Sequence, residues 1–564
     1  MLERPVTIGD LFGWLSPGIN RRGVLLCGTH GYEQHNAHRS WRGLAKRIAA
    51  TGCTTLRFDY PGEGDSGDFG AGELEAWIGS IRRATNYLRI ELGAEEIVLV
   101  GLRLGGTLAA LSAQEETVDR LILLAPFVTG RAYLREMKLQ ARACNLLPNG
   151  NPMPEDSGTL NVGGFYLNAT LISDLSAISL DFGKRFFAPR ILLMGADNGG
   201  LAAKFAALGS DVTTAPFTDL KQLVASALNS TLTEATASLV AEFAASGALQ
   251  RLMPPPSLFP AGCITGTTWR EKSVQFGPNM FGIFCGPADI KPLAATILFL
   301  NMGMNVHSGY GRQTTTLARS LTDMGVSSLR MDLLGVGDSA DRDDEDSPLY
   351  NLKALDDVRA AIDYLVGLEH GPVVVAGTCN GAYLAFHAIC QDDRIRGAVL
   401  ANLYCFDWNH THHSVPFSEN PVRSIGAYAN LLRQSQAWRR VLSGRTPVVS
   451  ITYGLLRRSG RKWLQKIAKV FVSTNRDLTV SDRIVKLRVR GAHLALIYSA
   501  GDLGLADLRA HLGKSSAKIA QLIGEPVRIL EGADHAFGTT KSQMEILCVL
   551  RNIISKFPPK ATNP

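Results

Sequence analysis

Two glycine-framed turns hold the residues with the clearest chemical potential. One is Gly377-Thr-Cys379-Asn-Gly381, which follows an apolar run at 373–376, and the other is Gly101-Leu-Arg103-Leu-Gly105 in the first half of the chain. A strand that enters a helix through such a strained turn exposes the central residue, and small flanking residues give the bend room. A cysteine at that place can act as a nucleophile, whereas an arginine cannot. The pattern predicts a reactive Cys379 and an inactive counterpart at Arg103.

Downstream of Cys379, the sequence offers a carboxylate and a base in the order that a thiol nucleophile needs. Residues 493–502, HLALIYSAGD, are typical of a buried strand whose exit carries Asp502, and residues 527–538, VRILEGADHAFG, of a last strand and a loop that presents His535. A histidine deprotonates the thiol, and a carboxylate orients the histidine. Asp534 competes for the carboxylate role, but adjacent loop residues usually point apart. The predicted catalytic triad is Cys379, Asp502 and His535.

An acyl-transfer site also needs donors for the negative charge that develops on the carbonyl oxygen. We expect these to be two backbone N–H groups, one at Asn380 after the nucleophile and one at Met304 in the loop 301–305. The side chains of these two residues are not implicated. The simpler interpretation of Cys379 is a buried packing cysteine, the common role of a free cysteine. The glycine frame and the downstream Asp502 and His535 favour catalysis.

An internal repeat supplies the elements that must position these residues. Residues 56–68, LRFDYPGEGDSGD, parallel residues 329–341, LRMDLLGVGDSAD, and the apolar runs before the two turns correspond as well. Short β-branched runs that alternate with amphipathic helices predict a mostly parallel sheet covered by helices on both faces. We therefore expect an α/β fold in two tandem domains, 1–255 and 266–564, joined through a proline-rich stretch at 252–263.

These motifs resemble the α/β-hydrolase superfamily, and the resemblance covers nearly the whole chain. A more specific similarity is to hydrolase-like proteins of exosortase and exopolysaccharide gene clusters, which are often grouped under a serine aminopeptidase-like heading. The matching segments are residues 56–67 and 125–137 in the first half, and residues 329–339, the GTCNGA turn, 402–408, 497–513 and GADHAFG in the second. Similar proteins keep a cysteine in the turn, which implies that Cys379 is the nucleophile. Arg103 departs from the pattern of the family.

The first half retains only part of this machinery. Asp197 occupies the position of the triad acid, but no histidine is present in residues 212–222, where the base belongs. Arg103 is therefore expected either to pair with Asp197 or to bind a carboxylate or phosphate group of a ligand. Three histidines in the run GTHGYEQHNAHR invite a metal proposal, but their spacing on a loop is weak evidence. We expect no metal and no cofactor, and a first domain that supports or partly covers the second.

A basic segment is predicted to form a cap over the second domain, at about 405–490. Arginine and lysine dominate it, as in YGLLRRSGRKWLQKIAKVFV from Tyr453 onward, and acidic residues are sparse. Three interpretations remain open: a solvated helix face, a docking surface for CoA or an acyl carrier protein, and contact with an anionic membrane surface. Nucleic acid is excluded as a partner because no recognised binding motif accompanies the charge.

Bulk composition is that of a globular protein. The chain has 564 residues, a net charge of +7 and 46% hydrophobic residues, which suits two domains. Its N-terminal run lacks the features of a secretory signal, and no apolar run is long enough for a transmembrane helix. The nine cysteines show no paired spacing. We expect a cytoplasmic protein.

The predicted function is an enzyme that forms an acyl thioester on Cys379. Transfer of the acyl group to water makes it an esterase or thioesterase, and transfer to another acceptor makes it an acyltransferase. Thiolate is both a good attacking and a good leaving group, which favours thioester substrates. A non-catalytic scaffold of a polysaccharide or secondary-metabolite cluster is the alternative from another class. A peptidase ranks last, because no acidic clamp for a substrate amino terminus is identifiable.

Overall fold

The computed structural model describes most of the chain. The described ranges are 3–69, 72–154, 158–183, 188–196, 200–247, 262–289, 295–342, 347–368, 371–408 and 478–557. Asp197, most of the proline-rich stretch and all but the two ends of the predicted basic cap lie outside these ranges. None of the described helices has the length and apolar character needed to cross a membrane.

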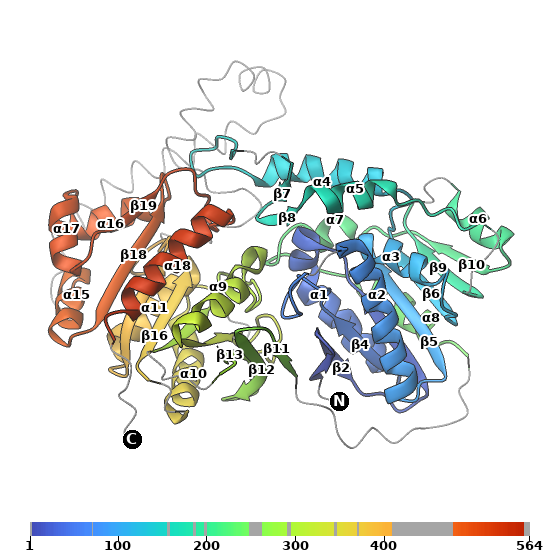
Figure 1. Ribbon diagram of the computed structural model, residues 1–564, viewed down its shortest axis with the longest axis horizontal. Coiled ribbons are helices and arrows are strands. Elements are labelled where there is room, and N and C mark those ends of the chain that lie inside the picture. Colours follow the sequence, from blue (N-terminus) through green and yellow to red (C-terminus); the bar gives the residue numbers. More distant parts are fainter. Residues whose placement is uncertain are drawn as a thin grey trace, which may run out of the picture.

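The first half of the chain forms an eight-stranded sheet (Figure 1). Its strand order is β1-β2-β4-β3-β5-β6-β9-β10. The pairs β1–β2 and β2–β4 are antiparallel. The pair β4–β3 and all the pairs that follow it in the sheet are parallel. The strands are β1 (Arg4–Ile8), β2 (Leu11–Ser16), β3 (Arg22–Cys27), β4 (Thr54–Phe58), β5 (Glu96–Leu102), β6 (Arg120–Leu124), β9 (Arg190–Met194) and β10 (Asp211–Ala215).

The second half forms a nine-stranded sheet with the same order and one extra strand, β11, at its edge. From β14 onward all pairings are parallel. The mostly parallel α/β architecture predicted from the sequence is thus confirmed. The strands in sheet order are β11 (Cys263–Thr265), β12 (Trp269–Phe276), β13 (Met280–Pro287), β15 (Ser327–Met331), β14 (Thr296–Leu300), β16 (Val373–Thr378), β17 (Ile395–Ala401), β18 (His493–Ser499) and β19 (Arg528–Leu530).

Helices cover both faces of each sheet, and the central strands are buried on both sides. In β14 and β16, Leu298 and Val375 belong to one apolar cluster, whereas Ile297 and Val374 belong to another. Successive side chains of a strand point to opposite faces, so the two clusters lie on opposite sides of the sheet. The main helices are α1 (Gly31–Ala49), α2 (Glu73–Asn86), α3 (Leu104–Ser112), α4 (Gly130–Cys144), α5 (Ala169–Ala177), α8 (Glu234–Ala245), α9 (Gln313–Leu321), α10 (Leu355–Gly367), α11 (Asn380–Gln391), α15 (Val480–Val489), α16 (Gly504–Leu512), α17 (Ser516–Ile523) and α18 (Thr540–Ile554).

Helix α15 falls within the range predicted for the basic cap, yet it belongs to the body of the second half. Its buried residues Val480, Ile484 and Leu487 join the apolar cluster that also contains Cys379. The apolar face of this helix therefore packs on the core, as in other amphipathic surface helices. The cap as predicted extends too far at its C-terminal end, because residues 480–489 are core-covering helix.

The two sheets meet through their antiparallel strands. The Trp14 ring of β2 lies 4.4 Å from the Phe281 ring of β13, in an edge-on arrangement. Phe12 also packs on Phe281, at 6.4 Å between ring centroids. Both rings sit in one buried cluster with core residues of the second sheet. The apolar contact is flanked by ion pairs between the halves, which are described below.

Candidate active site

Cys379 occupies a sharp turn between β16 and α11. Its backbone has φ 57° and ψ −113°, in the left-handed range that non-glycine residues rarely adopt. The flanking glycines are required by close approach: a Cβ on Gly377 would lie 2.4 Å from the Gly381 carbonyl carbon, and a Cβ on Gly381 would lie 2.9 Å from the Leu300 carbonyl oxygen. Such strain persists only where the surroundings enforce it, as at catalytic sites. The structure thus forms the turn that the sequence pattern indicates.

The structure brings Asp502 to His535. Asp502 follows β18, is buried, and its Oδ2 lies 2.6 Å from Nδ1 of His535. The second oxygen of Asp502 accepts a hydrogen bond of 2.9 Å from the Gly504 amide. Asp534, the competing acid, instead accepts the Gly538 amide at 2.7 Å and so closes its own loop. The loop is anchored further because Asn402 donates to the His535 carbonyl at 2.8 Å.

The ring of His535 also interacts with Cys379. Burial opposes protonation of the ring, but the charge of Asp502 and then the Cys379 thiol hold the pKa of His535 well above its ordinary value. Since Nδ1 faces Asp502, Nε2 is the nitrogen that serves the thiol. An imidazolium with a carboxylate on one side stabilises a thiolate on the other. The three residues that the sequence singled out are therefore gathered in one place.

Tyr350 is a residue of this site that the sequence analysis missed. Its hydroxyl lies 3.1 Å from Sγ of Cys379, and both side chains are buried. Burial and the neighbouring thiol raise the pKa of Tyr350 well above its usual range, so the hydroxyl keeps its proton and can donate it to a thiolate at Cys379. The Tyr350 backbone has φ 52°, and its ring stacks on Trp408 at 4.2 Å. Apart from its contact with Cys379, the unusual feature of Tyr350 is its strained backbone, and no sequence pattern predicts that strain.

Replacement of Tyr350 by phenylalanine should slow alkylation of Cys379 at neutral pH. A hydrogen bond to a charged group contributes about 1.5–3 kcal/mol, so losing it should lower the rate about 10- to 100-fold. The rates of iodoacetamide labelling of the wild type and Tyr350→Phe measure this effect. Tyr383→Phe is the control, because the Tyr383 ring lies beside Tyr350 at 5.3 Å and belongs to the same core. Equal rates for the two variants would contradict a role for the hydroxyl.

The two predicted oxyanion donors lie on elements adjacent to Cys379. Asn380 is the first residue of α11, and its Oδ1 accepts the Tyr350 amide at 2.6 Å. Met304 lies in the loop after β14, where the Asn305 amide donates to the Met302 carbonyl at 3.2 Å and closes a turn. Backbone N–H groups at a helix N-terminus are suited to a developing oxyanion. The assignment of these two amides remains a prediction.

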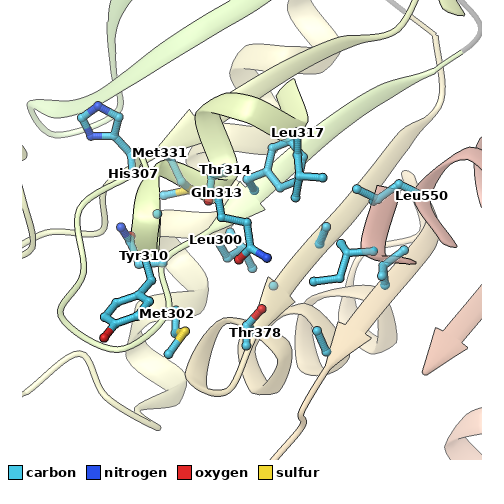
Figure 2. A pocket seen from close by; sticks show the side chains of 18 of the residues that line it. Leu300, Met302, His307, Tyr310, Gln313, Thr314, Leu317, Met331, Thr378 and Leu550 are labelled. Atoms are coloured by element: carbon cyan, nitrogen blue, oxygen red, sulfur yellow. The ribbon is translucent and has the colours of Figure 1, made fainter. Parts of the chain in front are cut away.

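A small cavity lies behind the loop that contains Met304 (Figure 2). Its volume is about 40 Å³, and its lining includes Met302, Gln313 and Thr378, which Figure 2 labels. Cys379 is not among the lining residues. A cavity of this size has room for a few water molecules but not for an acyl chain. We therefore regard it as space beside the site and not as the substrate pocket.

Arg103 adopts the same backbone geometry as Cys379, with φ 54° and ψ −119°. Its Nη2 lies 3.1 Å from Oε1 of Glu33 and also contacts Glu136, and its guanidinium lies 4.1 Å from the centre of the Phe127 ring. The predicted partner, Asp197, lies outside the described residues. Glu33 and Glu136 are the partners that the sequence analysis missed. Two carboxylates already neutralise the Arg103 guanidinium, so these contacts do not favour the binding of an anionic ligand there.

The three histidines of the first half each contact a different residue. His30 lies 2.6 Å from Glu63, His35 packs edge-on against the Tyr310 ring, and His38 lies 3.2 Å from Asp338. Within the part of the chain that the structure describes, the residues close enough to hold a cation are His307, Asp332 and Asp338. Ion pairs with His307 and Arg57 already engage these carboxylates.

Comparisons with known proteins agree with this topology. The family model described as Hydrolase_4, serine aminopeptidase, S33, matches residues 20–155, a range that includes Arg103. The chain has an α/β-hydrolase fold. None of the curated proteins matches it.

The matches to similar solved structures each cover about half of this chain. Est1E from Butyrivibrio proteoclasticus with bound ferulic acid is 18% identical, with a TM-score of 0.31, and the match covers 43% of this chain and 96% of the other. A serine hydrolase without a lid from Xanthomonas campestris is 11% identical, with a TM-score of 0.30 and coverages of 53% and 99%. Mouse alpha/beta hydrolase domain-containing protein 10 is 12% identical, with a TM-score of 0.29 and coverages of 51% and 99%. Similarity this low transfers no activity.

Proposed function

We propose that the second half is a cysteine-dependent acyl-transfer enzyme that acts on an ester or thioester. The observation that supports this most strongly is the Asp502–His535 contact of 2.6 Å beside Cys379 in the strained turn. A base in contact with its orienting acid, next to a thiol in a strained turn, is the arrangement that covalent catalysis requires. A scaffold protein has no chemical need for a thiol held by a histidine and a tyrosine.

The reaction follows from these contacts in two steps. The Cys379 thiolate attacks the carbonyl carbon, the bond to the leaving alcohol or thiol breaks, and His535 gives the leaving group a proton. In the second step His535 takes a proton from water or from an acceptor, whose oxygen or nitrogen attacks the acyl carbon and releases the thiolate. Asp502 holds the imidazole ring throughout. The amides of Asn380 and Met304 would bind the oxyanion in both steps.

Two tandem domains, 1–255 and 266–564, are part of the same proposal. Two sheets of matching strand order support it, and so does the paired geometry of Arg103 and Cys379 at equivalent turns. The first domain lacks a nucleophile and is proposed to have lost catalysis. The association with exosortase or polysaccharide gene clusters also stays a prediction.

The partner and location of the enzyme are proposals of the same kind. CoA or an acyl carrier protein would present the acyl group, and the basic segment, which lies outside the described residues, would attract its phosphates. All nine cysteines are free, which suits a reducing compartment such as the cytoplasm.

The direct test is to trap the acyl-enzyme. The protein is incubated with a panel of acyl-CoA and acyl-carrier thioesters, and its intact mass and peptide map are recorded. We expect an added acyl mass on the peptide that contains Cys379. No adduct with any donor, together with slow alkylation of Cys379, would overturn the proposal in favour of a scaffold.

A further inference from the structure

At the junction between the halves, each half inserts an equivalent aspartate into the other. The loop after β4 carries Asp65 into the second half, where it lies 2.8 Å from Arg330 and 2.6 Å from Nε2 of His307. The loop after β15 carries Asp338 into the first half, where it lies 2.6 Å from Arg57 and 3.2 Å from His38. Arg57 and Arg330 occupy matching places in the repeated LRFD and LRMD runs. The halves are therefore related as in an isologous dimer.

The consequences of the exchange differ between the halves. The Asp65 carboxylate contacts His307, which leads to the loop of the predicted oxyanion donor, whereas Asp338 joins the same network through its backbone amide, which donates to Oδ2 of Asp332 at 2.9 Å. The other nitrogen of His307 lies 2.7 Å from Oδ2 of Asp332, whose Oδ1 accepts a hydrogen bond of 2.8 Å from Asn301. Asn301 also donates to the Asn305 carbonyl at 2.9 Å and so closes the loop that contains Met304. A continuous buried network thus runs from Asp65 to this loop.

A second contact from the first half touches the loop of the catalytic base. The hairpin formed by β7 (Leu160–Val162) and β8 (Phe165–Leu167) turns at Gly163 and Gly164. A Cβ on Gly164 would lie 3.1 Å from Cα of Gly538, which closes the His535 loop. In Figure 1 the hairpin lies beside α4, at the upper side of the first half. Both loops that serve Cys379 are therefore held from outside their own half.

We propose that the first half is a positioning subunit for the active site of the second, with Asp65 as its main positioning residue. This inference rests on the proposed acyl transfer at Cys379. Without the Asp65 carboxylate, His307 and Arg330 each lose a buried partner, and unpaired buried charges rearrange their surroundings. A shift of the loop 301–305 would misplace the oxyanion donor while leaving the thiol and His535 in contact.

The test separates reactions that need the oxyanion donor from those that do not. In the full chain, Asp65→Asn should lower the rate constant of Cys379 acylation about 100-fold with little change in KM, as expected when one oxyanion donor is misplaced. Alkylation by iodoacetamide forms no oxyanion and should keep its wild-type rate. Asp338→Asn is the matched control, because this carboxylate is similarly buried in the same junction but pairs with Arg57 and His38 of the first half. The substitution leaves unchanged the backbone amide of residue 338, which donates to Asp332. It should acylate at close to the wild-type rate.

Equal losses in the two variants, or a parallel loss of acylation and alkylation in Asp65→Asn, would overturn the inference. If the wild type takes up no acyl group, the proposed function fails. In that case the rate of amide hydrogen exchange at residues 301–305 tests whether Asp65 positions this loop. The exchange should be faster in Asp65→Asn than in Asp338→Asn.

Two glycine substitutions provide a second test if Asp65→Asn does not fold. Gly164 and Gly158 have similar φ values of +88° and +83°, but only Gly164 faces another loop, since a Cβ on Gly158 meets nothing within 4 Å. Both alanine variants carry similar backbone strain. Gly164→Ala should therefore slow acylation more than Gly158→Ala, and equal rates would count against a positioning role for the hairpin.

Discussion

Replacement of Cys379 by alanine is expected to lower turnover of any acyl substrate by about 10⁴-fold or more, which is the scale seen when a covalent nucleophile is removed. The neighbouring Tyr350 hydroxyl does not replace the thiol as nucleophile, because it keeps its proton. The measurement is steady-state turnover of the thioester that acylates the wild type, with intact mass recorded in parallel. The adduct should disappear together with the activity.

Cys405 offers a matched control for this experiment. It is buried in the same apolar cluster as Cys379, and burial together with nearby Asp507 and Cys379 raises the pKa of its thiol. A thiol in that environment is inert packing. Cys405→Ala should therefore keep most of the activity and lose only stability. If it abolished acylation while Cys379→Ala did not, the nucleophile would be misassigned.

Removal of the base, by His535→Ala, is expected to lower the acylation rate by about 10³-fold, within the range for general acid–base catalysis. The same variant should slow Cys379 alkylation at neutral pH, because the base that takes the thiol proton is gone. Asp502→Asn should cost about 10²-fold or more, since the ring loses its orienting partner. The double variant should be little worse than His535→Ala, because the two residues act as one unit.

The pH dependence of stability gives an independent check on the Asp502–His535 pair. The folded-state pKa of His535 is raised, so the ion pair contributes fully below the unfolded value of about 6.5 and is lost as pH rises through the folded pKa. The excess unfolding free energy of the wild type over Asp502→Asn should thus be largest between about pH 5 and 6.5 and shrink toward alkaline pH. Denaturant titrations across this range measure it. An excess that grew with pH would contradict the assignment.

The residues predicted for catalysis could be found because each stands at a fixed place in a strong local pattern. Gly377 and Gly381 mark the turn around Cys379, and apolar runs end next to Asp502 and His535. Strands buried on both faces leave such runs in any parallel sheet, so their order along the chain predicts which loops meet at its edge. The same reasoning gave the mostly parallel α/β fold.

Other parts of the site carry no local pattern. Tyr350 sits in a loop before α10 and reaches Cys379 only because the fold brings that loop over the turn. Glu33 and Glu136 partner Arg103 from two helices, whereas the pattern pointed to Asp197. The predicted cap extended into α15 because its basic residues mask an apolar face that packs on the core.

The α/β fold, the strained turns at Arg103 and Cys379, and the predicted order of nucleophile, acid and base could be read from the chain, since each depends on residue types at short separations. Three contacts became visible only once the chain was folded: the carboxylate that reaches His535, the hydroxyl that reaches Cys379, and the pairing of Asp65 in the first half with His307 in the second. These contacts join residues that are distant in the chain. Their geometry depends on how the two sheets pack, and packing at a junction is not encoded in any one segment.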